Sequence, residues 1–91
     1  MIVSLEEAKL YLRVDGAAED ALITTFIETA EEICEGILRS SLSEFEEIPD
    51  TVKQAVLYVA ANLYEKRETL DMKEVMDIAS RLLFSYRKDG W

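Results

Sequence analysis

The chain has 91 residues, of which 49% are hydrophobic and 32% charged, and its net charge is −9. This length and balance predict one folded domain over residues 1–91 and exclude a disordered chain. No apolar run reaches the ~20 residues that span a bilayer, and the start lacks a signal-peptide pattern, so we expect a soluble protein made in a cytoplasm. The acidic charge disfavours nucleic acid as a tight ligand, because phosphates carry the same sign.

The first predicted helix begins at Ser4 and ends near Arg13. Glu7 follows Ser4 by three residues, which is the spacing of a capping box, in which a hydroxyl and a carboxylate each accept from a free backbone N–H. Leu5, Ala8 and Leu12 share one face of this helix. The segment around Gly16 then predicts a turn.

The second predicted helix runs from about Glu19 to Leu38 and is the long amphipathic element of the chain. Its apolar residues recur every three or four positions, and Cys34 lies in register with them, which predicts a buried structural thiol. A reactive thiolate would need basic neighbours, whereas here the neighbours are acidic. The opposite face carries four acids, which we interpret as a solvated surface or as an assembly contact: Glu28, Glu31, Glu32 and Glu35.

The link from Ser40 to Ile48 is polar and acidic, and we predict a mobile loop. Phe45 and Ile48 are apolar points within it. They either order on binding a partner or cover the ends of the neighbouring helices, and the second alternative is favoured.

The third predicted helix starts at Pro49, whose missing N–H does no harm in a first turn. Its main apolar stripe is joined by Leu57, Tyr58 and Ala61, so the middle of the helix is apolar nearly all round. A helix of this kind is buried on most sides. In so small a chain this indicates either the central helix or a subunit interface, and we list all three residues as candidate self-assembly contacts.

The fourth predicted helix follows Asp71 and Glu74, which offer a second capping box, and it ends near Arg87 and Lys88. Its apolar residues recur with helical spacing, while Phe84 points away from them. No strand pattern is present. The sequence therefore predicts an all-α fold, a small bundle of about four helices.

The sequence has few of the residue types and motifs that commonly carry catalysis. It has no histidine, only one cysteine and no glycine-rich phosphate loop. The commonest general base, the commonest transition-metal ligand and a thiolate metal site are thereby missing. We expect no enzyme activity, no metal and no cofactor.

Several segments together resemble the small head–tail connector proteins, also called head-completion or adaptor proteins, of long-tailed bacteriophages and prophages. The resemblance covers nearly the whole chain in order. It is carried by residues 5–15, 19–23, 49–57 and 62–68, and by the Leu82-Leu83 pair before Tyr86-Arg87.

This resemblance implies an all-helical virion protein that forms a homo-oligomeric ring beneath the portal at the head–tail junction. The ring would complete the head after assembly in the host cytoplasm and extend the DNA channel. Its partners would be itself, the portal protein and a downstream head-completion or tail protein. DNA would pass through without specific binding, and the family offers no catalytic residue to carry over.

The charge is uneven: residues 1–50 hold 13 acids and three bases, net −10, and residues 51–91 hold six acids and seven bases, net +1. Identical copies bring unlike regions together only head to tail. We therefore predict that the acidic side, Glu28 to Glu47, lies near basic residues of the next copy: Lys53, Lys66, Arg67, Arg81, Arg87 and Lys88. Candidate docking residues for other partners are Phe45, Ile48 and Trp91.

Two other functions remain open from the sequence. One is a small helical DNA-binding phage regulator or a terminase-small-subunit-like packaging protein. It would need a basic recognition helix, and the fourth helix offers Lys73, Arg81, Arg87 and Lys88, diluted by Glu74 and Asp77. The other is a helical adaptor that holds one partner helix in a groove.

Overall fold

The computed structural model describes residues 2–66 and 68–87, and within these residues it contains four α-helices and no strand. The α-helices are α1 (Leu5–Leu12), α2 (Asp20–Leu38), α3 (Asp50–Glu65) and α4 (Met72–Leu83). Two short 3-10 helices, η1 (Leu42–Glu44) and η2 (Phe84–Tyr86), complete the described chain. The predicted all-α class and the small four-helix bundle are confirmed.

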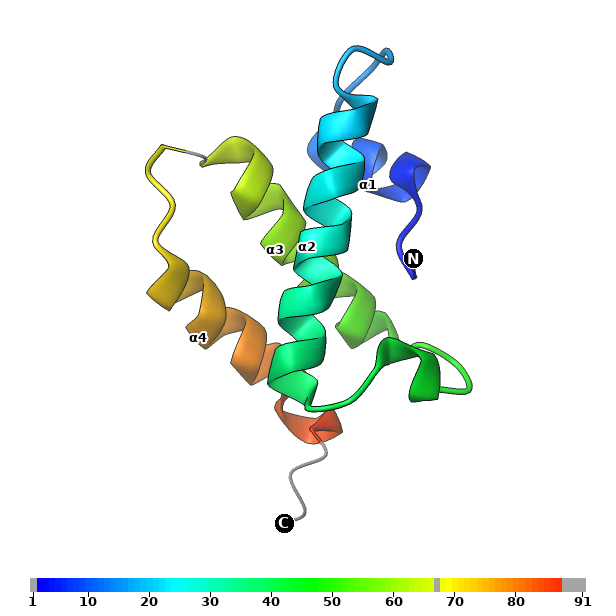
Figure 1. Cartoon of the computed structure of the whole chain (residues 1–91), viewed down its shortest axis with the longest axis vertical. Helices are drawn as coiled ribbons and strands as arrows, with labels where there is room; N and C mark the ends of the chain where they lie inside the picture. The colour runs from blue at the N-terminus through cyan, green and yellow to red at the C-terminus, as the bar shows by residue number, and fades with distance from the viewer. Residues whose placement is uncertain (1, 67, 88–91) are drawn as a thin grey trace.

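The helices form a flat molecule with α3 at its centre. α3 packs against α1, α2 and α4, and the overall extents are 44 × 30 × 16 Å. In Figure 1, α2 crosses the front, α4 lies on one side of it, and the loop after η1 lies on the other side. Because α3 has neighbours on three sides, its wide apolar surface is used inside the chain.

The predicted ends of the first two helices agree with the structure to within a residue. Ser4 caps α1: its hydroxyl accepts from the Glu7 N–H, and the Glu7 carboxylate accepts from the Ser4 N–H, which completes the capping box. Arg13 and Arg39 end α1 and α2 in the left-handed conformation, with φ of 61° and 60°. Such a residue commonly stops a helix, although it is more often glycine or asparagine.

The segment predicted as a mobile loop is more ordered than expected. Ser41 and Glu44 form a further capping box around η1, and Leu42 is only 4% exposed. The expectation of a plain loop overlooked the spacing of Ser41 and Glu44, which is the same signal that was used at Ser4.

Two further helix starts differ slightly from the prediction. Pro49 is the N-cap of α3 rather than its first helical residue. Asp71 caps α4 by accepting from the Glu74 N–H, and the described residues show this half of the predicted capping box alone. The first difference moves a boundary by one residue, and the second leaves the start of α4 as predicted. The end of α4 differs more: it was predicted near Arg87, but the α-helix stops at Leu83 and its last turn tightens into the 3-10 helix η2.

The core is continuous and draws on every helix and on the N-terminal segment. Val3, Ile27, Val56 and Leu83 are each fully buried, and further apolar side chains from α1 to η2 pack around them. Within residues 2–66 and 68–87, no helix is both long enough and apolar enough to cross a bilayer.

Candidate assembly interface

The three apolar residues that lie off the main stripe of α3 are covered within the chain. Leu57 is 9% exposed and Ala61 6% exposed, while Tyr58 is half-buried and packs on the core. Their coverage comes from the helices around α3, so the apolar character of this helix does not by itself require a second subunit. Their assignment to a self-assembly contact stays a prediction.

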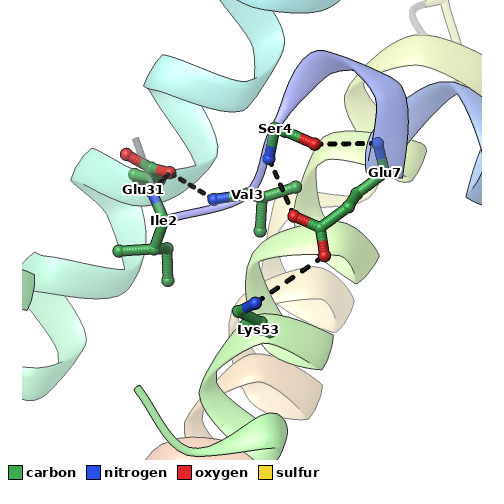
Figure 2. A network of polar contacts seen from close by, with 6 residues as sticks. All are labelled: Ile2, Val3, Ser4, Glu7, Glu31 and Lys53. Atoms are coloured by element: carbon green, nitrogen blue, oxygen red, sulfur yellow. Dashed lines mark hydrogen bonds and ion pairs between the residues drawn. The ribbon is translucent and has the colours of Figure 1, made fainter. Parts of the chain in front are cut away.

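The four acids of α2 divide into two pairs with different environments. Glu31 is half-buried and its carboxylate accepts from the backbone N–H of Ile2, at 2.8 Å, and of Val3, at 3.3 Å (Figure 2). Glu35 is also half-buried and accepts from the Leu42 N–H at 2.7 Å. These two carboxylates hold the N-terminal segment and η1 against α2.

The other two acids of α2, Glu28 and Glu32, are exposed. Among the described residues neither makes a hydrogen bond or an ion pair with a side chain. They remain available to solvent or to another molecule. The predicted acidic assembly face of α2 is therefore represented in the structure by Glu28 and Glu32 more than by Glu31 and Glu35.

Cys34 is fully buried on the inner face of α2. Burial is the main cause that raises the pKa of its thiol to about 12, and the nearby charges of Glu31 and Glu35 raise it further. The thiol therefore stays protonated at neutral pH and acts as a small apolar group, as the acidic neighbours in the sequence suggested.

A polar network holds α1 on the rest of the bundle. The Glu7 carboxylate, already engaged with Ser4, also lies 3.7 Å from the Lys53 ammonium on α3 (Figure 2). The hydrogen bond from the Ser4 backbone is the first cause that lowers the pKa of Glu7, and Lys53 lowers it further. Lys53, expected at a subunit contact, is thus half-buried and paired inside the chain.

A second polar cluster, which the sequence analysis did not predict, lies where α2 begins. The Lys9 ammonium lies 2.7 Å from the Asp20 carboxylate and also donates to the Gly16 carbonyl. The Tyr64 hydroxyl at the end of α3 donates to Glu19. Partners 11 and 45 residues apart follow no helical spacing, so no local pattern in the sequence could have signalled them.

The apolar points of the predicted loop face inward. Phe45 makes an edge-to-face contact with Tyr86, with ring centroids 6.1 Å apart and planes at 74°. Ile48 also packs on the core, and both side chains are half-buried. They cover the ends of the neighbouring helices in this structure, and their role in docking a partner stays a prediction.

The predicted basic contacts are spread over the surface. Lys66 and Arg81 are exposed, and Arg87 is half-buried at the end of η2. Arg67, Lys88 and Trp91 lie outside the described residues. The large apolar side chains that are most exposed in the described chain are Leu10 at 81% and Phe84 at 70%.

The described residues were compared with the ligand sets that hold metal ions. No three of them with acidic or thiol groups gather as ligands for a metal ion within residues 2–66 and 68–87. Glu7 and Cys34 have shifted pKa values with structural causes, a helix cap for Glu7 and burial for Cys34. Perturbed groups of this kind support the fold.

Comparison with known proteins gives one positive result. The family model described as "Phage gp6-like head-tail connector protein" matches residues 2–89, which include all four α-helices. No curated protein and no solved structure gives a significant match.

Proposed function

The chain belongs to the phage gp6-like head–tail connector family, and we infer from this that it forms a homo-oligomeric ring between the portal and the tail. In this proposal the ring completes the filled head, extends the DNA channel and presents a surface to the next head-completion or tail protein. Its place is the head–tail junction of the virion, and its subunits assemble in the host cytoplasm. DNA passes through without specific binding.

One observation carries this proposal: the match runs from residue 2 to residue 89 and so covers the bundle from its N-terminal segment through η2. A connector of this family is a structural component of the phage, which agrees with a chain that has no histidine and whose cysteine is buried.

The DNA-binding alternative is less well supported by the geometry. A recognition helix must present its side chains to a groove of DNA. The middle of α3 is covered by other helices, and exposed Lys73 and Arg81 on α4 alternate with exposed Glu74 and Asp77. These acidic side chains would face the DNA phosphates together with the basic side chains and would repel them.

The direct test is a phage that lacks this chain. We expect heads that are filled with DNA but carry no tail, because the portal would lack the surface on which the next protein docks. Supplying the chain in trans should restore tailed particles, and electron microscopy should show added ring density below the portal. Normal tailed particles without the chain would contradict the proposal.

An electrophoretic mobility shift at low salt separates the DNA-binding alternative. We expect the chain not to retard duplex DNA, because a net charge of −9 opposes binding to phosphates. Retardation that disappears on replacing Lys73 and Arg81 would favour the regulator instead.

A further inference from the structure

A groove runs between the C-terminal half of α2 and α4. Its lining includes Gly36, Ser80 and three apolar side chains, which we call its apolar floor: Ile33 and Ile37 from α2 and Met76 from α4. Arg39 and Arg87 lie at its end, and a second hollow around Ser80 and Arg87 continues it to Arg81 and Phe84. We name this surface the arginine-lined groove.

The lining of this groove has one sign of charge. It includes three arginines, and no carboxylate is among the described residues that form it. Arg39 and Arg81 form no ion pair with any described residue, and Phe84 beside them is 70% exposed. Cations around an apolar floor fit a partner that brings carboxylates on a compact, partly apolar segment.

This same chain carries such a segment, residues 45–50, which we name the acidic loop. Glu46, Glu47 and Asp50 are exposed in it, while Phe45 and Ile48 are turned toward the core. Since Phe45 packs on Tyr86, the loop is held in place before any partner arrives. A preformed loop loses less conformational entropy on docking than a disordered one.

The two surfaces lie on different sides of α2 and approach each other at η2, where Phe45 of the loop packs on Tyr86. In Figure 1 the acidic loop is the green segment on one side of α2, and α4, which forms a wall of the groove, lies on the other side. Two unlike surfaces on one chain suit a head-to-tail contact, in which each copy uses one surface for each neighbour.

We propose that the arginine-lined groove of one copy receives the acidic loop of the next copy, and that this contact builds the ring. The inference rests on the proposed connector function, which requires a ring but does not say which surfaces form it. Opposite charges would set the register of the contact, and the apolar floor and Phe84 would supply buried area.

Duplex DNA is the competing occupant of a surface with three arginines. The observations favour the protein loop for two reasons. A phosphate backbone gains nothing from the apolar floor of Ile33, Ile37 and Met76, and the chain as a whole repels DNA through its net charge.

The first test reverses the charges on each surface separately. One variant carries Arg39→Glu and Arg81→Glu in the groove, and the other carries Glu46→Arg and Glu47→Arg in the loop. Each alone sets like charges against each other, so self-association measured by analytical ultracentrifugation should weaken at least about tenfold. Circular dichroism of each variant checks that the helices remain.

Mixing the two variants is the decisive step. In the mixture, the reversed groove meets the reversed loop, and the native groove meets the native loop, so alternating copies satisfy every contact. Association should return to within about threefold of the wild-type value. A mixture that associates as weakly as its components would overturn the inference.

The second test uses cysteines and does not depend on charge reversal. Gly36→Cys places a thiol in the groove, where an added Cβ meets nothing within 4 Å, and Glu46→Cys places one on the loop. A chain with both should form disulfide-linked oligomers beyond the dimer, because a head-to-tail contact propagates. Native Cys34 is buried, so it leaves the pattern unchanged.

Glu6→Cys replaces Glu46→Cys in the matched control, since Glu6 is an exposed acid on α1 outside both surfaces and outside the predicted acidic contact side. This control should remain largely unlinked. Linked products that stop at the dimer, or that form equally well with the control, would overturn the inference. Two further results would also overturn the inference. Intramolecular linkage in a chain with Gly36→Cys and Trp91→Cys would assign the groove to the chain's own C-terminal segment. Protection of the Gly36→Cys thiol by duplex DNA would assign the groove to DNA.

Different results would contradict the inference and the connector function, so the two can be distinguished. Ring density on the portal of the same phage, together with unlinked Glu46→Cys and no rescue in the mixture, would leave the connector function intact and overturn the proposed contact. Loss of the chain without effect on tailed particles would instead contradict the connector function.

Discussion

Glu31 and Glu32 are adjacent in α2 but have different roles. Glu31 accepts two backbone N–H groups of the N-terminal segment, whereas Glu32 is exposed. Sequence alone could not separate them, because both lie on the polar side of an amphipathic pattern and the partner of Glu31 is 28 or 29 residues away.

Replacing Glu31 with alanine should therefore destabilise the fold. The N–H groups of Ile2 and Val3 would lose their charged acceptor, which costs about 1–2 kcal/mol in the free energy of unfolding. Urea denaturation followed by circular dichroism measures this change. Glu32→Ala is the matched control, with the same change in helix propensity, and should stay within about 0.5 kcal/mol of wild type. Equal effects at the two positions would contradict the role assigned to Glu31.

Cys34 gives a pH-dependent prediction. Folding raises its thiol pKa from an ordinary value of 9.0 to about 12, so the folded state favours the protonated thiol more than the unfolded state does. The resulting stability is complete below pH 9.0 and is lost as the pH rises from 9.0 toward about 12.

The measurement compares wild type with Cys34→Val, which has no thiol to titrate and fills a similar volume. The free energy of unfolding of wild type should fall relative to that of Cys34→Val as the pH rises above 9.0. The two proteins differ at this one side chain, so contributions from the rest of the chain cancel in the difference. A difference that is constant from neutral to alkaline pH would refute the buried thiol as its source.

At the level of helices, the sequence predicted what depends on short spacing. The helical periods located α1, α2, α3 and α4, and the Ser4–Glu7 spacing located the first cap. The sequence did not predict which neighbouring helix covers each face of a given helix. The apolar middle of α3 suggested a subunit contact, yet other helices of the same chain cover it, because coverage depends on tertiary packing.

The candidate assembly interface was likewise predicted in part from the sequence, while the rest depends on tertiary packing. The sequence pointed to acidic and basic regions that would meet between copies, from charge counts alone. The arginine-lined groove could not be predicted, because it combines residues 33–39 with residues 76–87 and exists only through the packing of α2 beside α4.

The two described glycines differ in whether their backbone conformation accepts a side chain, which gives a further prediction. Gly36 lies within α2, and a Cβ added there would meet nothing within 4 Å. Gly16 has φ of +79°, a conformation that disfavours a side chain.

Gly36→Ala should raise the free energy of unfolding by about 0.5–1 kcal/mol through better helix propensity. Gly16→Ala is the paired variant and should lower it by about 1 kcal/mol, because the left-handed conformation strains alanine. Thermal unfolding of both variants checks the pair. A destabilising Gly36→Ala would show that the groove does not tolerate an added methyl group.

On the scale of the whole molecule, folding uses part of the uneven charge internally. Glu7, Glu31 and Glu35 bind groups of their own chain, and Lys53 pairs with Glu7. Of the charge that remains exposed, the acidic loop carries Glu46, Glu47 and Asp50, and the arginine-lined groove carries Arg39 and Arg81. The other exposed charged residues are spread over the rest of the surface. Charge between exposed groups acts mainly on the encounter of two molecules, while apolar contacts govern how long they stay together.

Salt should therefore change the rate of ring formation more than the lifetime of the ring. Raising the salt concentration from about 0.05 M to about 0.5 M shortens the Debye length from more than 10 Å to a few ångströms, and so screens the loop from the groove before they touch. We expect association to slow by about tenfold in stopped-flow light scattering, and dissociation after dilution to change by less than about threefold. The Arg39→Glu and Arg81→Glu variant provides the control, because its like-charged surfaces should associate faster, not slower, as salt rises. A salt dependence confined to dissociation would mean that the charged groups act after docking, and that steering by these two surfaces does not occur.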